Sequence, residues 1–185
     1  RRIKKGCLFL PLVGDKFDGH DFISSALAAG AGGCLTARDP EEMLPGKFYI
    51  RVADTQDALR DLAVYYRSLF DIPVVAVTGS VGKTTTKDMV SAVLGEKYRV
   101  LKTDGNFNNN IGLPLTVLRL NRSHQIAVLE MGMNHFGEID YLTRIARPDV
   151  AIITNIGDAH IENMGSRENT LKAKCEIFHG MTAQG

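Results

Sequence analysis

The chain has 185 residues, of which 44% are hydrophobic and 23% charged, and its formal net charge is +1. This composition is typical of a globular protein with one or two domains. The small net charge argues against a broad nucleic-acid-binding surface, and no apolar run is long enough to span a membrane. Cys7, Cys34 and Cys175 form no CxxC motif. We therefore expect reduced thiols in a cytoplasmic protein, without a zinc site.

Residues 1–53 have the pattern of a small N-terminal α/β domain. Apolar runs predict short strands at residues 7–10, 33–36 and 48–52, and helical spacing predicts a helix over residues 20–29. Asp54 then offers an N-cap for a helix that continues through Phe70. We interpret residues 54–72 as a helix that links this domain to the next one.

Residues 73–185 predict a central domain with a P-loop-type parallel sheet and helices on both faces. The expected strands are residues 74–77, 99–102, 126–130 and 150–154. The expected helices are residues 83–97, 114–118, 138–146 and 168–178. Apolar strands that alternate with helices are typical of such sheets, whose ligands bind beyond the carboxyl ends of the strands. Because no closing strand follows the last helix, we expect an incomplete central domain from a longer protein.

The most informative segment is TGSVGKTT at residues 78–85, directly after an apolar strand. This pattern predicts a loop around nucleotide phosphates, in which Lys83 neutralises phosphate charge and the Thr84 hydroxyl binds Mg²⁺. The residues expected to contact the nucleotide are Thr78, Gly79, Ser80, Val81, Gly82, Lys83, Thr84 and Thr85. The usual motif has glycine at the position of Val77, whereas here the glycine is Gly79. An incidental Gly-Lys-Thr in a strand–turn–helix is the alternative.

Two further residues follow predicted strands at the same sheet edge. Glu130 ends a buried strand, where a carboxylate can bind Mg²⁺ directly or through water; a solvated carboxylate or a helix cap is the alternative. His160 follows the next strand and is a candidate ligand of a metal or of the phosphates, although a structural histidine has the same pattern. Together with the loop, these residues predict a Mg²⁺–nucleotide site.

Two other segments have alternative interpretations. The asparagine-rich residues 105–114 could offer donors and acceptors to a polar ligand, or could form an Asx-rich turn before a helix, and the turn is favoured. Lys172 and Lys174 are typical of surface lysines on an amphipathic helix. If Lys174 faces a Mg²⁺ site, carbamylation by CO₂ would replace its positive charge with a negative one. The spacing alone does not decide between these possibilities.

Taken together, these segments resemble the Mur ligase family of peptidoglycan synthesis across essentially the whole chain. The motifs that carry the resemblance are KGCLF and DGHDF near the N-terminus, TGSVGKTTTK, GNFNNNIGLPLTVLRL, LEMGMNHFGEI, and DAHIENMGS with KAKCEIF. The displaced glycine, Gly79, is part of the family's ATP loop. One departure is Cys175, where the family commonly has glycine. The family's C-terminal domain is also missing, so we expect this chain alone to bind nucleotide weakly and not to turn over.

The resemblance implies an ATP-dependent amide ligase that adds D-alanyl-D-alanine to UDP-N-acetylmuramoyl-tripeptide through an acyl phosphate. It implies four catalytic residues, Lys83, Glu130, His160 and Lys174, the last of them carbamylated. It implies three Mg²⁺ ligands, Thr84, Glu130 and His160. It also places the nucleotide near Asn109, and the UDP end of the substrate near Asp18, Gly19 and His20. We expect a cytoplasmic monomer.

Other functions remain open at this point. Within the same chemistry, the chain could belong to a sister ligase that adds the third amino acid, or to a folylpolyglutamate synthase-like enzyme. The asparagine-rich segment argues against both. A P-loop NTPase or regulatory nucleotide switch is less favoured, because the sequence contains no Asn-Lys-x-Asp guanine motif. A non-catalytic binding module is the remaining alternative.

Overall fold

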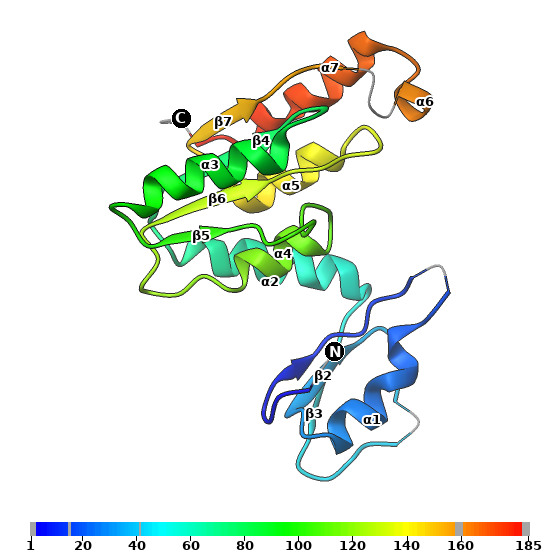
Figure 1. Cartoon of the computed structure of the whole chain (residues 1–185). Helices are drawn as coiled ribbons and strands as arrows, with labels where there is room; N and C mark the ends of the chain where they lie inside the picture. Colours follow the sequence, from blue (N-terminus) through cyan, green and yellow to red (C-terminus); the bar gives the residue numbers. More distant parts are fainter. Residues whose placement is uncertain (1–2, 15, 41, 158–160, 183–185) are drawn as a thin grey trace. The chain divides into compact units, whose positions relative to one another are not determined.

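The computed structural model describes residues 3–14, 16–40, 42–157 and 161–182. It consists of two compact units, Arg1–Asp61 and Leu62–Gly185. Helix α2 (Thr55–Ser68) contributes to both units (Figure 1). Its N-terminus confirms the predicted cap, because Asp54 Oδ1 accepts hydrogen bonds from the N–H groups of Gln56 and Asp57. Across the described part of the chain, no helix combines the length and apolar character needed to cross a membrane.

The first unit contains a small parallel sheet with an α-helix between its first two strands, which agrees with the predicted α/β pattern. Its elements are β1 (Leu8–Phe9), the 3₁₀ turn η1 (Gly19–Phe22), α1 (Ile23–Ala28), β2 (Gly33–Thr36) and β3 (Phe48–Arg51). The strand order is β1-β2-β3, and the core contains Ile23, Leu27, Ala31 and Cys34. The prediction of a single helix over residues 20–29 was wrong in one respect. Asp18 caps a 3₁₀ turn, which precedes the α-helix.

The second unit contains a four-stranded parallel sheet, which confirms the predicted fold class. Its strands are β4 (Val74–Thr78), β5 (Val100–Lys102), β6 (Ile126–Glu130) and β7 (Val150–Ile153). Their order in the sheet is β5-β6-β4-β7. Val77 pairs with Glu130, and Thr78 pairs with Ile153. The carboxyl ends of β4, β6 and β7 therefore meet at one edge.

Helices pack on both faces of this sheet (Figure 1). They are the C-terminal part of α2, α3 (Lys83–Gly95), α4 (Gly112–Val117), α5 (Glu138–Ala146), α6 (Ile161–Met164), α7 (Arg167–Cys175) and the 3₁₀ turn η2 (Glu176–Gly180). The predicted helix over residues 168–178 is thus an α-helix followed by a 3₁₀ turn. Helix α6 was not predicted, because a helix of four residues leaves no periodic pattern in a sequence.

The alternation of side chains along β4 explains the two layers. Val74 and Ala76 belong to a large core with α4, α5 and α7, whereas Val75 and Val77 face a smaller core beneath α3. All five residues of β4 are buried. A strand that is buried on both faces needs apolar side chains at every position, and this need accounts for the run VVAV in the sequence.

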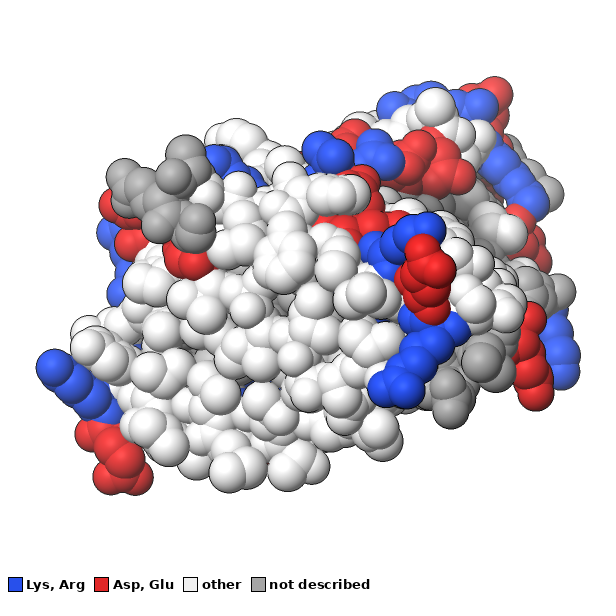
Figure 2. Space-filling model, turned by 90° about the horizontal axis from the view of Figure 1, so that it is seen from above, with Lys and Arg blue, Asp and Glu red and all other residues white. Residues whose placement is uncertain are grey.

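The α3 side of the sheet is only partly covered near β7. The face shown in Figure 2 has a broad central area without Lys, Arg, Asp or Glu. An apolar groove of about 410 Å³ lies between α3 and β7, and Met89, Val93 and Val150 on its lining are 65%, 74% and 49% exposed. In the described part of the chain, β7 is the edge strand on this side.

A buried arginine, Arg67, lies at the amino-terminal end of the sheet, where the strands begin. Arg67 donates through Nε to Ala146 O (2.9 Å), through Nη1 to Phe70 O (2.6 Å) and through Nη2 to Ile72 O (3.1 Å). Burial lowers the pKa of Arg67, and the nearby Asp149 carboxylate partly opposes this effect. The guanidinium therefore joins α2, the end of α5 and the segment that leads into β4.

Candidate functional site

The loop between β4 and α3 turns sharply at Gly79. This residue has φ +148°, and a Cβ atom there would lie 1.9 Å from Thr154 Oγ1. Only glycine fits this position without displacing Thr154, because a side chain would be both strained and obstructed. Gly82, with φ +80°, then begins α3 as its N-cap. The displaced glycine of the motif is therefore explained by the close approach of the segment that follows β7.

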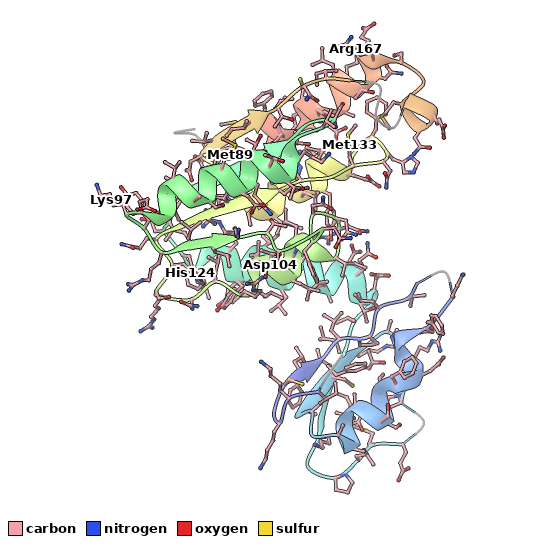
Figure 3. All side chains as sticks on the ribbon, viewed as in Figure 1. Met89, Lys97, Asp104, His124, Met133 and Arg167 are labelled. Carbon is pink, nitrogen blue, oxygen red and sulfur yellow. The ribbon has the colours of Figure 1, made fainter. Side chains whose placement is uncertain are left out.

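The loop is tied to the segment after β7 by polar contacts that the sequence did not reveal. Ser80 N donates to Asn155 O at 3.1 Å, and Val81 N donates to Asn155 Oδ1 at 3.0 Å. Gly157 N donates to Ser80 Oγ at 2.9 Å. Arg167 on α7 (Figure 3) holds the same segment by donating to Ile156 O from Nε and Nη2. In this structure the N–H groups of Ser80 and Val81 are thus engaged within the protein.

Lys83 lies at the first position of α3 and bends back over the loop. Its Nζ donates to Gly79 O at 2.9 Å and to Ser80 O at 3.4 Å. Thr84 and Thr85 are exposed in the first turn of the helix. N–H groups in a first turn have no intrahelical acceptor, so they add to the positive potential there. Thr78, by contrast, is buried, and its hydroxyl donates to Met131 O at 2.8 Å.

Glu130 stands opposite Val77 in the sheet, at the base of this loop. Its side chain is 1% exposed. Oε1 accepts a hydrogen bond from Asn108 Nδ2 at 2.7 Å, whereas Oε2 is buried and has no hydrogen-bond partner among the described residues. A buried carboxylate oxygen without a partner is energetically costly. It is therefore positioned to accept a cation.

The available ligand atoms fit Mg²⁺ better than they fit an ion whose ligands all come from the protein. Within the described ranges, no group of three or more His, Cys, Asp or Glu side chains could hold a metal. Mg²⁺ does not need such a group, because it is usually bound through one or two carboxylates together with water and phosphate oxygens. Glu130 and Thr84 would supply the ligands from this part of the chain. His160, the third predicted ligand, lies outside the described residues.

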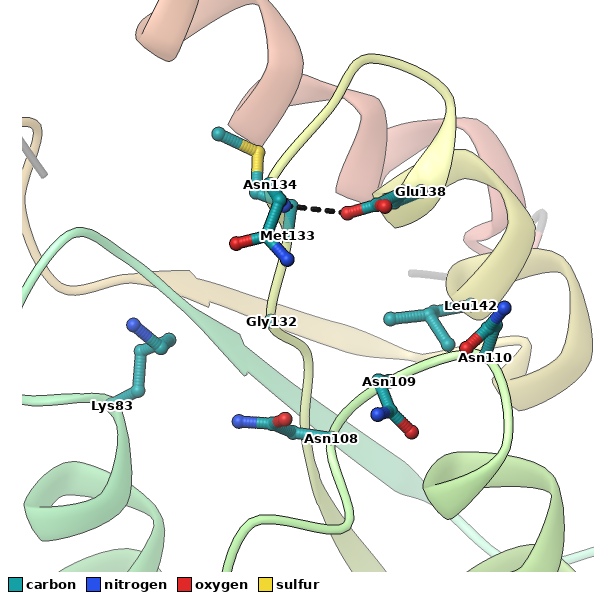
Figure 4. Close-up of a pocket in the computed structure, with 9 residues that line it drawn as sticks. All are labelled: Lys83, Asn108, Asn109, Asn110, Gly132, Met133, Asn134, Glu138 and Leu142. Atoms are coloured by element: carbon teal, nitrogen blue, oxygen red, sulfur yellow. Dashed lines mark hydrogen bonds between the residues drawn. The ribbon is translucent and has the colours of Figure 1, made fainter. Parts of the chain in front are cut away.

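A pocket of about 300 Å³ opens beside Lys83, between the asparagine-rich segment and the segment after β6 (Figure 4). Its lining residues are Lys83, Asn108, Asn109, Asn110, Gly132, Met133, Asn134, Glu138 and Leu142. The asparagine-rich segment is braced by Asp104 (Figure 3), which pairs with Arg119 at 2.6 Å. The pocket is polar and lies at the carboxyl edge of the sheet, where ligands of such sheets bind.

Asn109 and Asn108 have different surroundings. Asn109 Oδ1 accepts from Ile111 N (3.2 Å) and Gly112 N (2.8 Å), so it forms the turn that begins α4. The Asx-turn interpretation of this segment is confirmed, and the predicted nucleotide contact of Asn109 stays a prediction. Asn108, which the sequence did not single out, contacts Glu130 instead. No signal within the asparagine run distinguished Asn108 from its neighbours.

Lys174 is the largest of the fully buried side chains among the described residues, with 1% exposure. Burial, and to a smaller extent the positive charge of Lys83, lowers the pKa of Lys174 to about 8. No carboxylate of the described residues lies within ion-pair distance of its Nζ. The surface-lysine alternative is therefore wrong for Lys174. It holds for Lys172, which is 62% exposed and pairs with Glu168.

The three predicted substrate-binding residues of the first unit form a hydrogen-bonded turn. His20 Nε2 accepts from Ala37 N at 3.0 Å, so Nδ1 carries the proton and donates to Asp18 Oδ1 at 2.6 Å. The N–H and imidazole of His20 hold the pKa of Asp18 below its ordinary value. A Cβ on Gly19 would lie 2.6 Å from Leu12 N. His20 and Arg38 line a polar pocket of about 340 Å³.

Comparison with known proteins places these features in a family. Residues 77–185 match the family model of the Mur ligase middle domain, and residues 1–67 match that of the Mur ligase family, catalytic domain. Over 185 residues the chain is 51% identical to the UDP-N-acetylmuramoyl-tripeptide–D-alanyl-D-alanine ligase of Bacillus subtilis (strain 168). The alignment covers 100% of this chain and 40% of that protein.

Solved structures give the same assignment. A crystal structure of MurF from Acinetobacter baumannii has a TM-score of 0.94 and 41% identity, and the match covers 98% of this chain and 40% of that one. The MurF ligase from Thermotoga maritima, in complex with ADP, has a TM-score of 0.88 and 39% identity, over 97% and 42% of the two chains. This chain therefore spans about two fifths of the length of these relatives. Because the middle-domain match alone, residues 77–185, covers more than half of the sequence, the chain belongs to the Mur ligase family.

Proposed function

We propose that this chain supplies the ATP loop and part of the catalytic site of a ligase that joins D-alanyl-D-alanine to UDP-N-acetylmuramoyl-tripeptide. The observation that carries the proposal is Glu130 Oε2, which is buried opposite Val77 at the base of the Lys83 loop and has no hydrogen-bond partner in the part of the chain that the structure describes. A carboxylate that can bind a cation, next to a phosphate-binding loop, is the combination that nucleoside triphosphate chemistry requires.

In the proposed reaction, the tripeptide carboxylate attacks the γ-phosphorus of ATP, which releases ADP and forms an acyl phosphate. The amine of D-alanyl-D-alanine then attacks the acyl carbon. The tetrahedral intermediate loses a proton and expels phosphate, leaving the amide. Lys83 would move from the carbonyls of Gly79 and Ser80 to the phosphates, where its charge neutralises that of the transferring group. Mg²⁺, when bound through Glu130 and Thr84, would screen the phosphate charges.

Lys174 is proposed to act in its carbamylated form. An ammonium group buried near Lys83 would repel both that lysine and a Mg²⁺ ion. Carbamylation converts the ammonium into a carboxylate-like anion, which removes the repulsion. The lowered pKa of Lys174, about 8, supports this assignment because only the neutral amine attacks CO₂.

The substrates are proposed from the relatives. The Bacillus subtilis relative is a ligase of UDP-N-acetylmuramoyl-tripeptide and D-alanyl-D-alanine, and the Thermotoga maritima relative binds ADP. The pocket beside His20 and Arg38 has the polar lining expected for the UDP end of the first substrate. We propose contacts with Asp18, Gly19 and His20 there, a cytoplasmic location and a monomeric state. The predicted domain limits, 1–53, 54–72 and 73–185, also remain proposals.

Phosphate release by the full-length protein tests this function. Release should require ATP and UDP-N-acetylmuramoyl-tripeptide, and amide product should appear only when D-alanyl-D-alanine is added. Release without either substrate would favour a plain NTPase. Product with a single amino acid in place of the dipeptide would favour a sister ligase. Residues 1–185 alone are expected to bind nucleotide weakly and form no product, and amide formation by them would contradict the expectation that they are a fragment.

A further inference from the structure

We propose that Asn108 is a positioning residue that makes Glu130 present a single carboxylate oxygen to the divalent cation, and that it thereby sets a preference for Mg²⁺ over Ca²⁺. This inference rests on the proposed function, since it assumes that Glu130 binds the cation of a nucleotide complex.

The contact between the two side chains engages one oxygen of Glu130 and not the other. Asn108 Nδ2 donates to Glu130 Oε1 at 2.7 Å. The other carboxylate oxygen of Glu130, Oε2, has no hydrogen-bond partner among the described residues. Because the carboxylate is 1% exposed, water does not compensate freely for the missing partner. Oε2 is thus the oxygen that a cation would use.

Asn108 is itself held in place from two sides. Gly132 N donates to Asn108 O at 2.8 Å, which fastens the asparagine-rich segment to the chain just after β6. The amide group also packs against Gly132, where an added Cβ would lie 3.1 Å from Asn108 Cγ. The glycine therefore makes the room that the Asn108 amide occupies, and the amide cannot turn away without losing its contact with Glu130.

The backbone of Glu130 is fixed as firmly as its side chain. Glu130 N donates to Thr103 Oγ1 at 3.0 Å, and Thr103 O accepts from the buried Lys87 Nζ at 3.0 Å. Both ends of Glu130 are therefore anchored by residues that a bound cation would not touch. Such outer contacts orient a metal ligand, and removing one typically weakens metal affinity about 10- to 100-fold.

A carboxylate with one oxygen engaged binds a cation through the other oxygen only. Mg²⁺ takes one-oxygen ligands in a tight octahedron, whereas Ca²⁺ has more ligands and often takes both oxygens of a carboxylate. Removing the Asn108 donor would free Glu130 Oε1 and allow two-oxygen binding. Loss of Asn108 should thus weaken Mg²⁺ binding more than Ca²⁺ binding.

The test uses the full-length protein with ADP and follows bound Mn²⁺ by electron paramagnetic resonance, with Mg²⁺ or Ca²⁺ added as competitor. Asn108→Leu, which keeps the branched shape but cannot donate, and Asn108→Ala should weaken Mg²⁺ binding about 10-fold or more. The ratio of Mg²⁺ to Ca²⁺ affinity should fall as well. Gly132→Ala, which crowds the amide, should shift both quantities in the same direction by less.

Asn106→Ala is the matched control, because Asn106 is exposed in the same segment and contributes its backbone carbonyl to Asn108 N. It should leave both quantities unchanged. Unchanged Mg²⁺ affinity and Mg²⁺/Ca²⁺ ratio in folded Asn108→Leu protein would overturn the inference while leaving the proposed function intact. If the Asn108 variants fail to fold, unchanged values in Gly132→Ala overturn it. Failure of the wild-type protein to bind both ADP and Mn²⁺ would overturn the proposed function, and this inference with it.

Discussion

The buried Lys174 leads to a quantitative prediction about its reaction with CO₂. Its pKa is lowered from 10.5 to about 8. At pH 7 about one in ten such amines is neutral, compared with about three in ten thousand at the ordinary pKa. The neutral amine attacks CO₂ and loses a proton to give the carbamate. The reactive neutral fraction of Lys174 at pH 7 is therefore roughly 300-fold larger than that of a surface lysine.

The perturbation is Lys174→Met in the full-length protein, and the assay is carbon-13 NMR in labelled bicarbonate. Wild-type protein should show a carbamate signal that grows as the pH rises toward about 8 at constant dissolved CO₂, and Lys174→Met should lack it. Lys172→Met is the control, because Lys172 is 62% exposed on the same helix, and it should keep the signal. No signal in the wild type, or an equal signal in Lys174→Met, would refute the reasoning.

The same lowered pKa predicts how stability depends on pH in buffer free of CO₂. Between pH 8 and 10.5 the unfolded chain holds more protons at this lysine than the folded protein, so stability rises with pH. Below pH 8 the folded state bears the full cost of the buried ammonium, at most about 3 kcal/mol. Urea unfolding should therefore show Lys174→Met to be more stable than wild type at pH 7, with a smaller gain at pH 10. A loss of stability at pH 7 would contradict this.

Three further substitutions test other parts of the structure. Gly79→Ala should destabilise the protein by roughly 1–3 kcal/mol in urea unfolding, because its Cβ would lie 1.9 Å from Thr154 Oγ1. Gly95→Ala, where a Cβ meets nothing within 4 Å, should not, and equal effects would reject the steric argument. Arg67→Leu should lower the free energy of unfolding by about 3 kcal/mol in thermal or urea unfolding, because three carbonyl groups lose their hydrogen-bond donor. A decrease within 0.5 kcal/mol, as is usual at a surface site, would show that these hydrogen bonds contribute little. Lys83→Met should weaken ATP binding at least about 30-fold by calorimetry with little change in stability, and unchanged affinity would remove Lys83 from the phosphate site.

The local elements were largely predictable because their signals lie within short stretches of sequence. The uninterrupted apolar run of β4 indicated a strand buried on both faces, and Asp54 indicated the start of α2. The predictions were wrong where a helical segment changes between α and 3₁₀ geometry. The turn at Gly19–Phe22, which Asp18 caps, is 3₁₀, and the end of the predicted helix over residues 168–178 tightens into a second 3₁₀ turn. Apolar spacing does not distinguish these from α-helix over a single turn.

The candidate site was predictable only in outline. The pattern at residues 78–85 identified a phosphate-binding loop, and the end of β6 identified Glu130. Nothing in the asparagine run separated Asn108 from Asn109, because both occupy the same kind of sequence. Their different contacts depend on which side chain faces β6 when the segment folds against it.

By itself, the sequence determined the α/β class, the position of the loop and the residue types that its chemistry needs, because propensity and periodicity act over a few residues. Only the tertiary structure decided that Gly79 lies against Thr154, that Asn155 engages the loop N–H groups, and that Lys174 is buried near Lys83. These contacts join residues about 70 or more positions apart. They arise from the strand order β5-β6-β4-β7, which brings the carboxyl ends of distant strands to one edge.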